Sequence, residues 1–190
     1  MLPTRRAGLY EHVLAAAFSD AECDTAIARQ TALAMAAWGV LCDRSQGRRF
    51  LQPTDDLPYT VLSALADETS RAGKVRLLRQ AGKGFEFVHD QMHLYLAARW
   101  LSRPERSGRQ IAALFSSTDL WKHYAGTEAE PLWRFLMDAL DDVRLHELWD
   151  ALNLVRDWEP LARLLAIELS RRGVPAPPAW PSLDPQPEAD

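Results

Sequence analysis

The stretch from His89 to His93, His-Asp-Gln-Met-His, has the spacing of a zinc-binding helix. Two histidines four residues apart share one helical face and can both reach a zinc ion, while an acidic residue between them activates the bound water. Asp90 is one methylene shorter than the glutamate that this chemistry uses, and His123 and His146 follow without a motif that would supply a third ligand. The sequence therefore disfavours a zinc hydrolase and predicts no metal site.

Two Gly-Lys pairs raise the alternative of phosphate chemistry. A phosphate-binding loop requires Gly-x-x-x-x-Gly-Lys followed by Ser or Thr, because the amides and the lysine hold the phosphates and the hydroxyl holds Mg²⁺. Val75 follows the first pair and Gly84 follows the second, so neither pair meets this requirement. Asp138, Asp141 and Asp142 lie in a helix-like context and are expected on a solvated helix face. With no nucleophile elbow or Ser-His-Asp spacing either, the sequence predicts a protein without a catalytic site.

The charge balance argues against several classes of partner. The 190 residues include 22 basic and 26 acidic side chains, a net charge of −4, which provides no domain-wide attraction to nucleic acid or anionic membranes. No apolar run is long enough for a membrane span, and the start lacks a signal-peptide cleavage site. The two cysteines, Cys23 and Cys42, form no zinc or disulfide framework. We expect a cytoplasmic protein.

Apolar residues recur at helical spacing through most of the chain. In the first helix, Leu9, Val13 and Phe18 are expected on the apolar stripe. Helices are predicted at about 9–18, 20–41, 58–73, 90–101, 107–117, 118–125, 130–140 and 143–172, the last interrupted at Pro160. The anchors of the C-terminal helices are Phe115, Trp121, Trp133, Phe135, Trp149 and Trp158. Six of the 12 prolines lie in 175–190, so this segment is predicted to be a disordered tail.

One segment breaks the helical pattern. Two runs that alternate with a period of two, Val75–Arg79 and Phe85–His89, flank a Gly-Lys-Gly turn, which predicts a β-hairpin at about 75–89. The alternation places Phe85, Phe87 and His89 on one strand face, and Leu77 and Leu78 on opposite faces. The helix at 90–101 is apolar on most sides and is therefore expected to be buried.

The predicted fold class is mainly α with one hairpin: a winged-helix-like three-helix unit, followed by a helical bundle or the start of a helical repeat. In a DNA-binding winged helix, the helix before the hairpin enters the major groove. Here that helix carries Asp67 and Glu68 and one arginine, Arg71, so acids would face the phosphates. The hairpin offers cations at Lys74, Arg76, Arg79 and Lys83, so a DNA-binding regulator stays an alternative, and a helical adaptor with no nucleotide link is a second one.

The segment FEFVHDQMHLYLAARWL resembles the end of the winged-helix domain in NACHT-type STAND NTPases. In that family an aromatic-x-His strand end leads into a helix of the form polar-aromatic-Gln-Glu-aromatic-Leu-Ala-Ala. The residues that match are Phe87, Val88 and His89 at the strand end and Met92, Tyr95, Leu96, Ala97 and Ala98 in the helix, while His93-Leu94 replaces the Gln-Glu pair. The resemblance implies a closing helix at 1–18, a winged-helix-like domain at 19–102 and a helical domain at 103–174. It also leads us to expect that Trp100 and Leu96 are buried against the helices after 105.

The resemblance further implies a non-catalytic regulatory role, in bacterial defence or signalling. The family's histidine that matches His89 contacts the β-phosphate of bound ADP and holds the inactive state. Because this chain lacks a phosphate loop, it would bind no cofactor by itself, and ADP or ATP would bind only together with a P-loop NTPase domain, in cis or in trans. The implied partner is therefore a protein, and neither a membrane nor nucleic acid.

Overall fold

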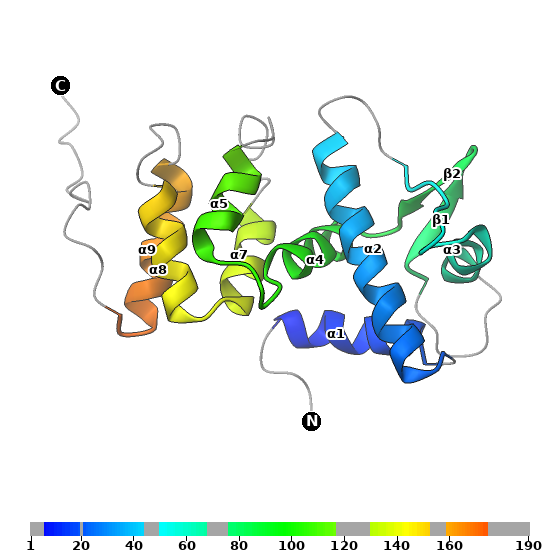
Figure 1. The fold of residues 1–190 in the computed structure, drawn as a ribbon, viewed down its shortest axis with the longest axis horizontal. Coiled ribbons are helices and arrows are strands. Elements are labelled where there is room, and N and C mark those ends of the chain that lie inside the picture. The colour runs from blue at the N-terminus through cyan, green and yellow to red at the C-terminus, as the bar shows by residue number, and fades with distance from the viewer. Residues whose placement is uncertain are drawn as a thin grey trace, which may run out of the picture.

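The computed structural model describes residues 6–19, 21–43, 50–67, 76–116, 130–152 and 159–174. These residues contain eight helices and one antiparallel hairpin, which confirms the predicted fold class of mainly α with one β-hairpin. In chain order the elements are α1 (Arg6–Ala17), α2 (Cys23–Asp43), α3 (Tyr59–Ala66), β1 (Leu78–Ala81), β2 (Gly84–Phe87), α4 (Asp90–Leu101), α5 (Gly108–Ser116), α7 (Glu130–Ala139), α8 (Asp142–Leu152) and α9 (Glu159–Arg171). Figure 1 shows α3 and the hairpin at one end of the row of elements and α8 and α9 at the other.

One predicted helix boundary is wrong. The helix that follows Pro58 ends at Ala66 and not near Gly73, because Asp67 has an extended backbone with φ −71° and ψ 122°. The segment predicted at 143–172 contains the separate helices α8 and α9, and Pro160 lies in the first turn of α9, where its missing N–H removes no intrahelical hydrogen bond. The predicted helix at 118–125 and the predicted tail at 175–190 fall outside the described residues.

The hairpin is shorter than the sequence pattern indicates. β1 begins at Leu78 and β2 ends at Phe87, and their register pairs Leu78 with Phe87 and Ala81 with Gly84. The two-residue turn between the strands has Gly82 at φ 60°, a conformation that glycine adopts without strain. Leu77 and Leu78, predicted on opposite faces, are both buried. Leu77 lies before the strand, and its N–H donates to the Leu65 carbonyl of α3.

Leu51, between the helices predicted at 20–41 and 58–73, pairs with the hairpin. The Leu51 N–H donates to the Phe85 carbonyl at 2.7 Å, and the Phe85 N–H donates to the Leu51 carbonyl at 3.0 Å. Gly84 permits this approach, because a Cβ there would lie 2.9 Å from the Leu51 oxygen. The hairpin is thus held on one side by the chain that leads into α3.

Helix α4 lies at the centre of the molecule (Figure 1). The buried residues among its 12 are Met92, His93, Leu94, Tyr95, Leu96, Ala97, Ala98 and Leu101. Helices α2 and α7 both pack extensively along it, and α1 and β2 make smaller contacts. The prediction of a buried helix at 90–101 is therefore confirmed.

Two arginines tie the turns of the C-terminal helices together. The Arg144 guanidinium donates to the carbonyl of Ser102, just after α4, and to the Asp141 carboxylate before α8. The Arg172 guanidinium donates to the carbonyls of Met137 and Leu140 at the end of α7. Cations at the carboxyl ends of helices bind carbonyls that have no partner within the helix. These contacts fix where α7 and α8 turn.

Helix α5 packs closely against α8 at Gly108. Its N–H donates to the Glu147 carboxylate at 2.8 Å, and a Cβ on this residue would overlap the Arg144 carbonyl oxygen and the Leu148 amide nitrogen. The predicted aromatic anchors Phe115, Trp133, Phe135 and Trp149 are all buried beyond this crossing. Trp121 and Trp158 lie outside the described residues.

The crossing at Gly108 predicts opposite effects for two glycine substitutions. Gly108→Ala should destabilise the protein by about 1–3 kcal/mol or more, because backbone atoms of α8 must move to admit the methyl group. Gly39→Ala in α2 should stabilise by about 0.5–1 kcal/mol, because nothing lies within 4 Å of its Cβ position and glycine weakens a helix. Urea unfolding of both variants tests this; a Gly108→Ala protein as stable as the wild type would contradict the close crossing.

Candidate functional site

The candidate site is the junction between the hairpin and α4. His89 is the residue before the helix, with an extended backbone of φ −124° and ψ 120°. Its carbonyl accepts the N–H groups of Met92 at 3.0 Å and His93 at 3.2 Å, so the backbone here is fixed. Its side chain makes no capping hydrogen bond and is exposed. The imidazole therefore points to solvent from a rigid base.

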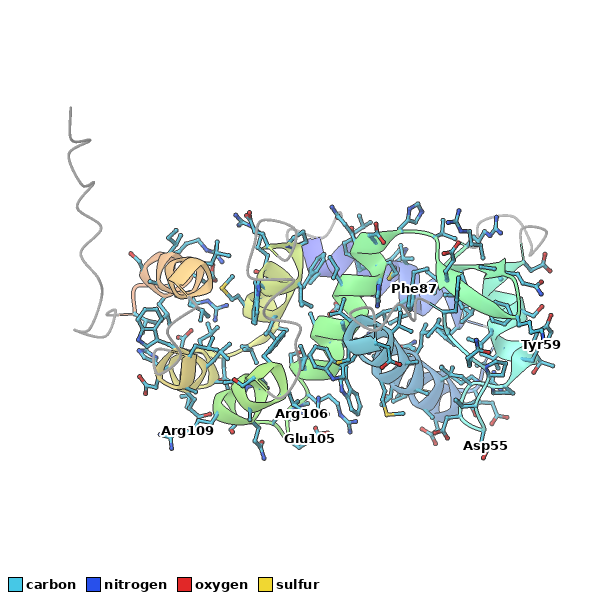
Figure 2. The ribbon with its side chains drawn as sticks, turned by 90° about the horizontal axis from the view of Figure 1, so that it is seen from above. Asp55, Tyr59, Phe87, Glu105, Arg106 and Arg109 are labelled. Atoms are coloured by element: carbon cyan, nitrogen blue, oxygen red, sulfur yellow. The ribbon has the colours of Figure 1, made fainter. Side chains whose placement is uncertain are left out.

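The residues that carry the family resemblance on α4 are almost all interior. Those that are buried are Met92, Tyr95, Leu96, Ala97 and Ala98, each with 5% exposure or less. Phe87 is half-buried at the end of β2, where Figure 2 shows it beside the start of α4. The α4 side chains build the core, and of the three matched residues before α4, Phe87 and Val88 are half-buried and His89 is exposed.

The expectation for Trp100 is wrong in part. Its indole is only half-buried, whereas Leu96 is fully buried as expected. The Arg106 and Arg103 guanidinium groups lie 4.1 and 4.8 Å from the ring centroid, and Arg106 also donates to the Trp100 carbonyl. Figure 2 shows Arg106 and Glu105 on the outer side of the turn between α4 and α5. The guanidinium groups of the α4–α5 turn thus lie over the ring, an arrangement that the aromatic face favours, while part of the indole packs against the core.

His93 is the buried polar residue of the described chain, at 4% exposure. Its Nε2 lies 2.8 Å from the Ala37 carbonyl oxygen of α2, so this nitrogen carries the proton that is donated. Its ring stacks on Phe87 at 4.7 Å between centroids and 8° between planes. His93 therefore joins the hairpin, α2 and α4.

The two histidines of the zinc-like spacing consequently have different surroundings. His89 is exposed, whereas the His93 ring is enclosed and bonded to a backbone carbonyl. No group of three or more side chains that could hold a metal occurs within the described ranges. The arrangement offers no pair of imidazoles aimed at one ion.

Sequence reasoning missed the contact between α1 and α4. The Tyr10 hydroxyl donates to the Gln91 side-chain oxygen at 2.7 Å, and the Tyr10 ring stacks on Tyr95 at 5.3 Å. Leu9, expected on the apolar stripe, is 53% exposed, because the stripe passes through Tyr10. The three-residue spacing from Tyr10 to Val13 is the sequence signal that would have placed Tyr10 on the buried face of α1.

The other potentially reactive or charged side chains near the site are either protonated or already paired. Burial raises the pKa of the Cys42 thiol to about 11, and the Asp43 carboxylate acts in the same direction, so a protonated and weakly nucleophilic thiol is expected at neutral pH. On the hairpin, Arg79 pairs with Glu86 of the opposite strand. Lys74 lies outside the described residues.

A cleft of about 310 Å³ lies between the end of α1, α2 and α3. The residues that line it are Ala17, Phe18, Ala21, Arg29, Thr60, Val61, Ala64 and Leu65. A second cleft lies between α1, α4 and α7. His89 lines neither, so its solvent-facing ring would meet a partner at the surface.

No protein-family model, curated protein or solved structure matches this chain. No helix in the described ranges is both long and apolar enough to cross a membrane.

The different surroundings of the two histidines predict different effects on stability. His93→Ala should destabilise the protein by about 2–5 kcal/mol, because it leaves a cavity beside Phe87 and removes a hydrogen bond to Ala37. His89→Ala should change stability by no more than about 0.5 kcal/mol, since its exposed ring makes no capping contact. Equal midpoints for the two variants in denaturant unfolding would contradict this assignment.

Proposed function

We propose that the chain is a non-catalytic regulatory module that acts with a P-loop ATPase domain, like the winged-helix control part of NACHT-type STAND NTPases. The observation that supports this proposal is the position of His89. Its imidazole is exposed, while the matching methionine, tyrosine, leucine and alanine residues on α4 are buried. A purely structural pattern would not require a histidine at this exposed place.

The local geometry suits a phosphate contact. His89 lies at the end of an extended segment. The residue before it, Val88, is held beside the hairpin, because its N–H donates to the Leu77 carbonyl at 3.0 Å. On the other side α4 begins, and the amino end of a helix attracts anions. Asp90 in the first turn offsets part of that attraction, so the contact depends on an imidazole N–H donated to a phosphate oxygen.

The nucleotide itself must be held elsewhere. The chain has no Gly-x-x-x-x-Gly-Lys-Ser/Thr loop, so the phosphates and Mg²⁺ would be bound by a P-loop domain in the same or a second polypeptide. In this proposal the module closes over ADP, holds the partner inactive and releases it on exchange for ATP. Such a role belongs to cytoplasmic signalling, and in bacteria to defence.

The charge distribution favours a protein partner over DNA. Helix α3 contains no basic residue, and Asp67 follows it directly. Arg79 on the hairpin is paired with Glu86, and the Arg76 Nε donates to the Leu78 carbonyl. Cations that are already engaged within the protein contribute less to binding phosphates.

The proposal predicts faster loss of ADP on removal of the His89 ring. A hydrogen bond to a charged group contributes about 1.5–3 kcal/mol, so His89→Ala should raise the ADP dissociation rate roughly tenfold to a hundredfold. The measurement is stopped-flow release of fluorescent ADP from a complex of the chain with a P-loop ATPase domain encoded beside it. His146→Ala, on distant α8, is the matched control and should release ADP at the wild-type rate (Figure 1). Identical rates for all three proteins would exclude the phosphate contact.

The same proposal predicts weak association with DNA. Binding of the full chain to a mixed-sequence duplex should be no tighter than about micromolar at physiological salt, the range of non-specific association. Fluorescence anisotropy across a salt series provides the measurement. Nanomolar binding that weakens steeply with salt would instead support the DNA-binding regulator.

A further inference from the structure

Helix α1 is attached to the turn of α4 that positions His89. The Tyr10 hydroxyl of α1 donates to the side-chain oxygen of Gln91 at 2.7 Å, and Gln91 lies two residues after His89 in the first turn of α4. In the same turn the N–H groups of Met92 and His93 donate to the His89 carbonyl. The hydrogen bond from Tyr10 therefore reaches the part of α4 from which the exposed imidazole projects.

Three aromatic rings from three helices set the angle at which α1 lies. The Tyr10 ring stacks on Tyr95 of α4 at 5.3 Å, with 24° between the planes, and meets Phe135 of α7 edge-on at 5.2 Å and 83°. Tyr95 and Phe135 are also in contact, at 5.6 Å. Stacked and edge-on arrangements of aromatic rings are favoured over other orientations. A rotation of α1, or a shift along α4, would break at least one of these contacts.

The rest of α1 is held by burial and by its following turn. Leu14 is 0% exposed and Phe18 is 6% exposed, and both belong to the same continuous core as α4. Separation of α1 from α4 would return these two side chains to water, which is costly. After the helix, the Ser19 N–H donates to the Ala16 carbonyl and the Ala21 N–H donates to the Phe18 carbonyl. Helix α1 is thus held along its whole length.

These contacts bear on where the regulatory module moves. The resemblance assigns 1–18 to a preceding helical domain, so that α1 would separate from α4 when the module opens. A hinge is a segment that absorbs a change of backbone angles while the packed elements on either side stay intact. The segment between α1 and α2 does not meet this description, because a change there would pull Tyr10, Leu14 and Phe18 out of their contacts.

We infer that α1 is a fixed part of the body that carries His89, namely α2, α3, the hairpin and α4. This inference rests on the proposed function. When ADP is exchanged for ATP, α1 turns together with His89 relative to the P-loop domain, and the Tyr10 contacts stay intact. The moving joint lies outside the segment from α1 to α4.

The first test uses the full chain alone and measures the distance between two spin labels by double electron–electron resonance. The labels are attached at Leu9→Cys on α1 and Lys83→Cys at the hairpin tip, both exposed, and Cys23→Ser and Cys42→Ala remove the native thiols. With Tyr10 intact, we expect one narrow distance distribution.

Variants of Tyr10 examine the cause of that fixed distance. Tyr10→Ala should broaden the distribution, because the contacts to both α4 and α7 are lost. Tyr10→Phe keeps the ring and should broaden it less. His12→Ala, which removes an exposed side chain of α1, is the matched control and should leave the distribution unchanged. A broad distribution with Tyr10 intact, or one that Tyr10→Ala does not alter, overturns the inference.

The second test uses the complex with the P-loop ATPase domain, and it needs no change at Tyr10. The distance between labels at residues 9 and 83 should be the same with ADP and with a non-hydrolysable ATP analogue. The distance from residue 83 to a label on the P-loop domain should differ between the two nucleotides. A nucleotide-dependent distance between residues 9 and 83 overturns the inference and leaves the proposed function intact. Two distances that both stay constant contradict the proposed function, and with it the movement inferred here.

Discussion

Helix α4 is apolar on nearly every side, and the rest of the structure depends on covering it. A buried leucine contributes about 1.5–3 kcal/mol relative to an exposed one, so leaving one face of this helix open would be costly. α2 and α7 cover two faces, α1 crosses a third and the hairpin closes the start. The exposed His89 marks the point at which this enclosure ends, which is why the imidazole is both accessible and firmly positioned.

A few hydrogen bonds with strict geometric requirements supplement this apolar packing. His93 replaces a core packing residue with a ring that also donates to a backbone carbonyl, so it fixes the rotation of α4 against α2 as well as its depth. Arg144 and Arg172 do the same for the C-terminal helices by binding carbonyls at the turns. Burial alone has little directional preference, and these hydrogen bonds supply the direction.

The fold was predictable from local patterns where a single element determines the outcome. The period of two around Gly82 gave the hairpin, and the all-round apolar character of 90–101 gave the central helix. What could not be predicted depends on contacts distant in sequence. The pairing of Leu51 with Phe85 and the contact of Tyr10 with Gln91 leave no periodic signal of their own. The partial exposure of Trp100 could not be predicted, because the sequence does not show that Arg103 and Arg106, in the turn after α4, lie over its ring. For the candidate site, the resemblance singled out His89, whereas the enclosure of His93 could not be predicted without knowledge of α2.

One hydrophobic core runs without interruption from α1 to α9, across the boundary expected near residue 102. Since α4 shares its faces between α2 and α7, the two halves of the chain hold this helix in common. A shared helix makes them one cooperative unit, in which local opening on one side weakens the other. Fragments divided at that boundary would each expose an apolar surface that the intact chain keeps covered, and binding energy gained at either end would stabilise the whole against unfolding.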